Sequence, residues 1–279
     1  MSKNLIARIA VAAVAIPVIL WISYRGGNWL AGMVTLFAVV GMAEFLIGEG
    51  HQPKGPTFWA ALIATTLLLV QSLGWIDWSV PWAFVLALIF LVSGMLFSVG
   101  KQPPAELFRA HSRLIWGVVY IGLLYPFVYR VGEVADGSAQ LPFSGGDSLL
   151  FLFGLLWVGD TAAMFTGKAI GKHKLAPAVS PNKTIEGFMG GLVGSLVIGV
   201  VMCFWKFDAV AWYHVLVLAL GCSVFGQLGD LVESMWKRSI GIKDSSAIIP
   251  GHGGVLDRFD SLLFAAPFMV FYFTFVLLQ

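Results

Sequence analysis

Charged residues are scarce in this chain of 279 residues. Asp, Glu, Lys and Arg make up 11% of it, whereas about a quarter of the residues in a soluble domain are charged. Hydrophobic residues make up 58% of the chain, and the mean hydropathy is +0.87. We therefore expect an integral membrane protein. The formal net charge of +2 is too small to indicate a nucleic-acid partner.

Cysteine is also rare, and both cysteines, Cys203 and Cys222, lie inside apolar segments. The chain has no Cys-x-x-Cys pair and no Cys/His cluster, so neither a disulfide framework nor a zinc site is expected. We interpret the two cysteines as small buried hydrophobic residues.

Long apolar runs are abundant, and a helix needs about 20 such residues to cross the hydrocarbon core of a bilayer. We predict an all-α polytopic membrane protein with a single domain over residues 1–279. Helices 1 to 5 lie in 1–146, and helices 6 to 9 lie in 147–279. The nine predicted spans are 5–24, 28–47, 57–74, 81–99, 113–130, 147–167, 185–205, 211–236 and 261–278. The first run contains Pro17 and lacks a small-x-small cleavage site, so we interpret it as a span rather than a signal peptide.

The distribution of Lys and Arg predicts the orientation, because cytoplasmic loops carry an excess of these residues. With a cytoplasmic N-terminus and an outside C-terminus, only Arg25, Arg130 and Lys206 lie outside, and the other Lys and Arg residues lie inside. The polar segments 168–184 and 237–260 then face the cytoplasm, and Val131–Gly146 lies outside. Because the short chain shows no soluble extension, we expect a bacterial inner membrane.

The sixth predicted span carries an acid near its cytoplasmic end, in Gly159-Asp160-Thr161. An acid at a helix end can simply reach the membrane surface. Asp160, however, has a short side chain and follows the apolar run Leu149–Val158. Since ionisable groups at membrane depth usually mark a function, we favour a ligand or polar-network role.

The segment Ser180-Pro-Asn-Lys-Thr-Ile-Glu-Gly187 is interpreted in two ways. It has the features of a helix start, with Pro181 in the first turn, a Ser or Thr cap and an early acid in Glu186. A helix N-terminus beside Lys183 could also receive phosphate oxygens. Spacing alone does not decide between the two. The preceding basic residues, from Lys168 to Lys174, suit either lipid headgroups or a substrate.

Four glycines in the seventh predicted span, from Gly187 to Gly194, form overlapping small-xxx-small patterns. We expect close helix packing within the chain, and a homodimer contact is the alternative.

The densest charge lies between Asp230 and Asp260, with five acids, four bases and a histidine. If the eighth span continues helically, Asp230, Glu233, Ser234 and Lys237 share one face. A solvated face with a Glu233–Lys237 pair is the alternative. Asp257 and Asp260 are also three residues apart. Paired acids on two helices could hold Mg²⁺ through oxygen ligands. The turn Pro250-Gly-His-Gly-Gly between them has the backbone freedom for close approach to phosphate.

Together these motifs resemble the phosphatidate cytidylyltransferase (CDP-diacylglycerol synthase) family. Its long signature of Ser, Lys-Arg, Lys-Asp, His-Gly-Gly and Asp-Arg-x-Asp matches Ser234 to Asp260 without a gap. The likeness covers residues 157–187 and 226–262, and the first five spans match only in hydropathy. Trp236 stands where the family usually has an aliphatic residue or Phe, and Met164 where a Tyr is expected. Neither departure removes a charged group.

The resemblance implies the reaction CTP + phosphatidate → CDP-diacylglycerol + pyrophosphate, with Mg²⁺ as cofactor. The family allows K⁺ as a second metal, although no residue here requires it. The implied metal ligands are Asp230, Asp257, Asp160 and Asp260. The implied catalytic residues are Asp230, Asp257, Lys237, Arg238, Lys243 and Arg258, and the implied substrate-binding residues are Ser180, Lys183, Thr184, Glu186, Ser234, His252, Gly253 and Gly254.

An ion-coupled transporter is the main alternative, because intramembrane acids can relay protons or bind Na⁺. The acids here gather near one face rather than at the midplane, and inverted repeats are not apparent. The motifs of a CDP-alcohol phosphotransferase and of a prenyltransferase are both missing.

Overall fold

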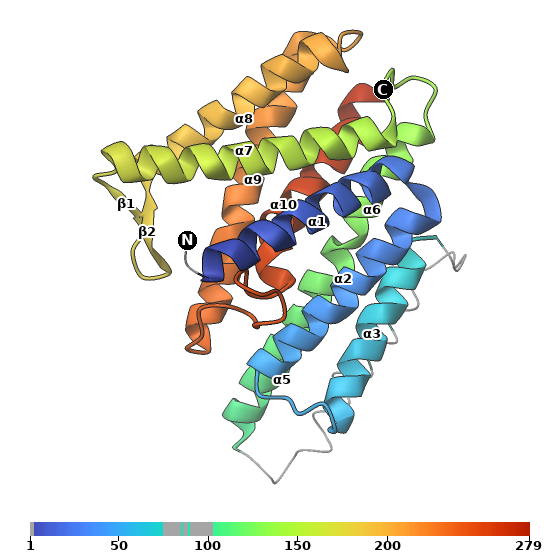
Figure 1. Cartoon of the computed structure of the whole chain (residues 1–279). Helices are drawn as coiled ribbons and strands as arrows, with labels where there is room; N and C mark the ends of the chain where they lie inside the picture. Colours follow the sequence, from blue (N-terminus) through green and yellow to red (C-terminus); the bar gives the residue numbers. More distant parts are fainter. Residues whose placement is uncertain (1–2, 75–84, 86–88, 90–102) are drawn as a thin grey trace.

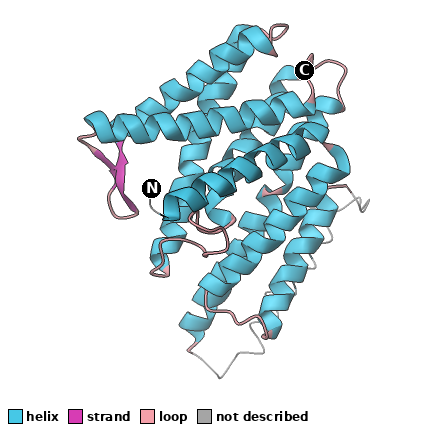
Figure 2. Cartoon of the chain, viewed as in Figure 1, coloured by secondary structure: helices cyan, strands magenta, loops and turns pink. Residues whose placement is uncertain are grey.

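The computed structural model describes residues 3–74, 85, 89 and 103–279, with side chains from residue 9 onward. It is helical apart from one short hairpin (Figure 2). In chain order the elements are α1 (Lys3–Arg25), α2 (Gly27–Gly48), α3 (Pro56–Ser72), α5 (Pro104–Leu124), α6 (Pro126–Asp136), α7 (Gly145–Ile170), β1 (Lys174–Ala176), β2 (Ser180–Thr184), α8 (Ile185–Trp205), α9 (Trp212–Ser239), α10 (Leu256–Tyr272) and the π-helical turn η2 (Phe273–Leu277).

Within the described residues, six helical segments are long and apolar enough to cross a membrane: Gly27–Gly48, Pro104–Asp136, Gly145–Ile170, Ile185–Trp205, Trp212–Ser239 and Leu256–Leu277. The predicted first and third spans correspond to shorter apolar helices, Ile9–Arg25 and Pro56–Ser72. The predicted span 81–99 lies outside the described residues, apart from residues 85 and 89. A helical, multi-pass membrane protein is therefore confirmed, and the count of nine spans stays a prediction.

The fifth span is longer than predicted, because α5 passes into α6 at Pro126 and the helix continues to Asp136. The predicted outside segment Val131–Gly146 is therefore partly wrong, and only residues 137–144 are non-helical. Polar side chains stabilise the extension. Arg130 pairs with Glu133 at 2.5 Å, and Asp136 accepts a hydrogen bond of 2.6 Å from the backbone of Gly145.

The predicted span 185–205 matches α8, but the residues Ser180–Thr184, which were interpreted as part of a helix start, form strand β2 and pair antiparallel with β1. Helix α8 begins only at Ile185, where the Thr184 hydroxyl accepts a bond of 3.1 Å from the N–H of Gly187. Thr184 is thus the cap, and placing Pro181 in the first helical turn was wrong. Glu186 fixes the hairpin, since its carboxylate accepts bonds from His173.

Small residues let α8 pack closely on α7. A Cβ atom added to Gly194 would lie 2.6 Å from the Cβ of Ala162, and one added to Gly187 would lie 2.9 Å from the carbonyl oxygen of Ala163. The glycine pattern therefore serves helix packing within the chain, as expected. This contact does not test whether the protein forms a homodimer.

The helices form two groups that meet along α10 (Figure 1). Helices α2, α3 and α5 contact one another, while α7, α8 and α9 form the second group. Helix α10 contacts both groups. The start of α1, the hairpin and the segment 240–255 lie toward one end of the helices, and residues 137–144 and the C-terminus lie toward the other.

Candidate active site

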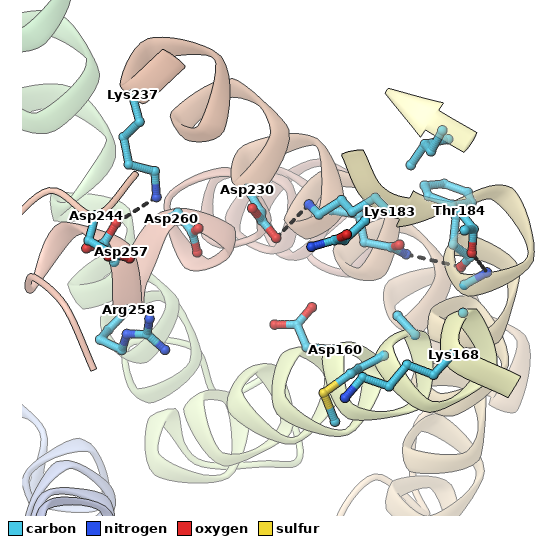
Figure 3. Close-up of a pocket in the computed structure, with 18 residues that line it drawn as sticks. Asp160, Lys168, Lys183, Thr184, Asp230, Lys237, Asp244, Asp257, Arg258 and Asp260 are labelled. Atoms are coloured by element: carbon cyan, nitrogen blue, oxygen red, sulfur yellow. Dashed lines mark hydrogen bonds and ion pairs between the residues drawn. The ribbon is translucent and has the colours of Figure 1, made fainter. Parts of the chain in front are cut away.

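One polar cavity of about 710 Å³ collects residues from most of the motifs singled out in the sequence, but none from the turn at 250–254. Helix α7, strand β2, helix α9 and the start of α10 contribute to its wall, together with Asp244 from the segment between α9 and α10. The predicted site residues that line it are Asp160, Lys183, Thr184, Asp230, Lys237, Asp257, Arg258 and Asp260. In Figure 3, Asp160 faces Asp230 and Asp260 across the space.

The polar face predicted for α9 exists, because the helix stays regular to Ser239. Asp230 pairs with Lys183 of β2, with 2.6 Å between Nζ and Oδ2. The Ser234 hydroxyl donates a bond of 3.3 Å to the other oxygen of Asp230. Ser234 does not line the cavity, so in this structure it orients Asp230 from one turn further along the helix.

A buried cation lies between two carboxylates at the end of the cavity. The Lys237 Nζ atom is 2.6 Å from Asp257 Oδ1 and 3.2 Å from Glu233 Oε1, and the three side chains are 10%, 3% and 0% exposed. A charge removed from water is tolerated only when it is paired and hydrogen-bonded. Glu233 and Lys237 thus form a buried pair, and the alternative of a solvated helix face is wrong.

Asp257 also organises the chain that leads into α10. Its Oδ2 atom accepts bonds from the N–H of Ser245 (2.8 Å), the hydroxyl of Ser245 (2.9 Å) and the N–H of Gly254 (2.8 Å). Both oxygens of this carboxylate are therefore engaged by protein donors. Direct metal binding by Asp257 stays a prediction.

The two glycines of the His-Gly-Gly turn are required by close packing. Gly253 has a positive φ of 84°, and a Cβ there would lie 2.7 Å from Asp257 Oδ2. A Cβ on Gly254 would collide with the Ser245 hydroxyl and lie 2.7 Å from the Glu44 carboxylate. In this structure the turn binds carboxylates of the protein itself. The prediction that Gly253 and Gly254 contact substrate is not tested.

Sequence reasoning missed Glu44, a carboxylate of α2 that is 1% exposed. It accepts bonds from the N–H groups of Val255 and Leu256 (both 2.9 Å) and from the hydroxyls of Ser245 (3.3 Å) and Ser246 (2.6 Å). No basic side chain within the described residues forms an ion pair with it. The first N–H groups of a helix lack intrahelical partners and favour a negative charge, so Glu44 stabilises the start of α10.

A second acid, Glu49 directly after α2, explains the unusual Trp236. The indole N–H donates a bond of 3.0 Å to Glu49, and the ring stacks on Phe45 with 4.8 Å between centroids. Glu49 also pairs with Arg113 of α5 at 2.7 Å. Trp236 therefore ties α9 to the N-terminal helices. The signal available in the sequence was two acids, Glu44 and Glu49, inside or at the end of an apolar run.

Several predicted site residues lie off the polar cavity. The Arg238 guanidinium donates to the backbone carbonyls of Ile242 (2.7 Å) and Val179 (3.3 Å), so it holds two loops together. Glu186 holds the hairpin, and Ser180 lies at the strand's start, away from the cavity wall. Lys243, His252 and Gly253 line a neighbouring cavity of about 460 Å³, to which Arg258 also contributes.

The cavity fits Mg²⁺ that arrives with a phosphate ligand. Within the described residues, no group of three His, Cys, Asp or Glu side chains could hold a metal by itself. Mg²⁺ is usually bound by one or two carboxylates plus substrate phosphates and waters, so an all-protein cage is not needed. The carboxylates of Asp160, Asp230 and Asp260 line the same cavity and supply such oxygen atoms.

The chain matches a family profile and several named relatives. The profile of the cytidylyltransferase family matches residues 6–276. A phosphatidate cytidylyltransferase of Staphylococcus haemolyticus is 37% identical over 267 residues, which cover 94% of this chain and 96% of the relative. Proteins of the same name from Staphylococcus saprophyticus and Staphylococcus aureus are 34% and 36% identical, with the same coverage.

Proposed function

This chain belongs to the cytidylyltransferase family, and we propose that this nucleotidyltransferase converts CTP and phosphatidate to CDP-diacylglycerol and pyrophosphate in phospholipid biosynthesis. The observation that carries the proposal is the convergence of Asp160, Lys183, Asp230 and Arg258 on one cavity. These residues come from four separate elements and present both carboxylates and cations to the same space.

The chemistry needs alignment and charge neutralisation rather than a side-chain nucleophile. The phosphate monoester of phosphatidate is largely anionic near neutral pH, because such phosphates have a second pKa of about 6. One of its oxygens attacks the α-phosphorus of CTP, forming a P–O bond. The bond from that phosphorus to the oxygen that bridges to the β-phosphate breaks, and pyrophosphate leaves. Phosphoryl transfer of this kind depends mainly on positioning and electrostatic stabilisation.

The basic side chains at the cavity have different roles. Lys183 lies at the helix α8 end of the cavity and Arg258 at the α10 end, so cations are available for two phosphate-bearing substrates. Thr184 lines the same wall beside Lys183. Lys237 is held between Glu233 and Asp257. It therefore serves the reaction chiefly by keeping the start of α10, and with it Arg258, in place.

The metal is assigned to Asp160, Asp230 and Asp260. Bound with the nucleotide, Mg²⁺ would neutralise charge that develops on the transferring and leaving phosphate oxygens. Lys183 already pairs with Asp230 at 2.6 Å. A phosphate group entering the cavity would compete for Lys183 and leave Asp230 available as an oxygen ligand.

We place the cavity on the cytoplasmic side of a bacterial inner membrane, with the N-terminus inside. The excess of Lys and Arg on that side supports this orientation. The start of α1, the hairpin and the segment 240–255 also lie toward one end of the helices (Figure 1). CTP would then reach the cavity from the cytoplasm.

The test is an assay of the purified protein in detergent with labelled CTP, phosphatidate and Mg²⁺. We expect labelled CDP-diacylglycerol and pyrophosphate in equal amounts, and no product after chelation of divalent cations. Asp230→Asn should abolish turnover, whereas Asp208→Asn, an exposed acid in the turn before α9, should not. An inactive wild-type protein beside an active relative would refute the proposed reaction.

A further inference from the structure

An apolar groove of about 620 Å³ lies beside the polar cavity. Helix α1 forms one wall with residues that include Ala12, Ala15 and Ile19, and α7 contributes Phe153 and Trp157 to the opposite wall. Its volume is within the range of about 300–1,000 Å³ that is common for ligand sites. The proposed CTP-binding residue Lys183 does not line it.

The groove meets the polar cavity at the start of α10. Asp160, Asp257, Arg258 and Asp260 line both spaces. The polar cavity is rich in charged groups, whereas the groove is lined mostly by apolar side chains beyond this junction, so together they match a molecule with an anionic head and a hydrocarbon tail. A water-soluble triphosphate has no hydrocarbon tail that would fill the apolar groove.

We propose that this groove binds an acyl chain of the lipid substrate, with the lipid phosphate at Arg258. The proposal rests on the proposed function and assigns the lipid half of that site. Arg258 is exposed, and no carboxylate within the described residues forms an ion pair with its guanidinium. Its charge is therefore available to an anion at the junction of the two spaces.

A second polar group at the same end of the groove has no partner. The Nδ1 atom of His252 is buried without a hydrogen bond in the structure, and His252 lines the groove beside Arg258. A buried polar atom without a partner costs free energy. A phosphate oxygen at Arg258 would supply an acceptor for the Nδ1–H form of this imidazole.

Small side chains on α1 leave space in the groove for the acyl chain. Ala12 and Ala15 are half-buried residues that face the groove, while Val14 on the same helix is 67% exposed and lies outside it. A bulky side chain at position 15 would fill volume that a long acyl chain needs. The same change at position 14 would extend away from the groove.

The test compares dioleoyl with dihexanoyl phosphatidate in Ala15→Trp and in the matched control Val14→Trp. We expect Ala15→Trp to lower kcat/KM for the dioleoyl substrate by about tenfold or more, as expected when apolar pocket contacts are lost. Turnover of the dihexanoyl substrate and both activities of Val14→Trp should match wild type. Equal losses on both substrates, or no loss on either, would overturn the proposal.

A measurement on the wild-type protein covers the case in which Ala15→Trp fails to fold. Phosphatidate with a diazirine in mid-chain should label peptides containing residues 11–19 or Trp157. Excess dioleoyl phosphatidate should suppress this labelling, and dioleoyl phosphatidylcholine should not. Labelling only elsewhere, or equal suppression by both lipids, would show that the groove is no acyl site. Failure of the proposed function itself would appear separately, as absent wild-type turnover of both substrates.

Discussion

The carboxylate of Glu44 accepts a hydrogen bond of 2.9 Å from the backbone N–H of Leu256, 212 positions further along the chain. A residue of α2 thus stabilises the first turn of α10, from which Asp257 and Arg258 reach the cavity. A helix of the N-terminal half, which the family profile also matches, therefore holds the catalytic segment. This contact gives the N-terminal half a role in the geometry of the site.

Replacing Glu44 should impair catalysis although the residue does not line the polar cavity. Glu44→Gln keeps one acceptor oxygen but brings an amide NH₂ against N–H donors, and Glu44→Ala removes the acceptor altogether. Hydrogen bonds to a charged group are worth about 1.5–3 kcal/mol each, so we expect kcat to fall roughly tenfold or more in Glu44→Ala and less in Glu44→Gln. Steady-state kinetics in detergent measure both.

Hydrogen–deuterium exchange separates a positioning role from general damage. Peptides covering residues 244–256 should exchange faster in Glu44→Ala, while those of α8 should not change. The matched control is Glu106→Ala, an exposed acid in the first turn of α5, which should behave as wild type. Unchanged exchange at residues 244–256 would contradict this role for Glu44.

Lys237 should contribute mainly to the stability of the folded protein. Lys237→Met leaves the carboxylates of Glu233 and Asp257 buried without their cation. Breaking a buried pair from one side typically costs about 3–5 kcal/mol. We expect a clearly lower thermal midpoint in detergent, and a partial recovery when Asp257→Asn is added to Lys237→Met.

The recovery in stability should not restore turnover. The double variant lacks both the Lys237 cation and the Asp257 carboxylate that accepts bonds from Ser245 and Gly254, so its activity should stay at background. Lys54→Met, which changes an exposed lysine in the loop before α3, is the control and should alter neither property. If the double variant is no more stable than Lys237→Met, the charges are not coupled as described.

Gly254 should tolerate no side chain. A Cβ there would meet the Ser245 hydroxyl and the Glu44 carboxylate, which are both held by other bonds. We expect Gly254→Ala to lose most activity and stability, because neither neighbour can move without breaking its own hydrogen bonds. Gly32→Ala, with nothing within 4 Å of the added atom, should fold and react normally. A fully active Gly254→Ala would show that the turn relaxes.

The sequence predicted those parts of the site that depend on local spacing. Asp230, Ser234 and Lys237 share a face because a regular helix repeats every 3.6 residues, and the structure keeps α9 helical to Ser239. Asp257 and Asp260 follow the same rule on α10. The convergence of these helices with Asp160 was inferred from family resemblance rather than spacing.

Long-range partners could not be predicted in the same way. Glu44 lies within an apolar run, and its partners are more than 200 positions away. The start of α8 at Ile185 agrees with the predicted span, but Ser180-Pro181, which has the composition of a helix start, forms a strand by pairing with β1. That pairing depends on a turn of the chain at residues 177–179, which residue preferences at Ser180 alone do not reveal.

The orientation can be tested with single cysteines on opposite ends of the helices. Ala139 lies exposed in the turn between α6 and α7, and Ala178 lies exposed in the turn between β1 and β2. In intact cells, an impermeant maleimide should label Ala139→Cys and should label Ala178→Cys only after the membrane is opened, because the positive side faces the cytoplasm. Wild-type protein, whose Cys222 is buried and Cys203 half-buried, gives the background. Labelling of Ala178→Cys in intact cells, with Ala139→Cys protected, would reverse the orientation and place the polar cavity on the side without CTP.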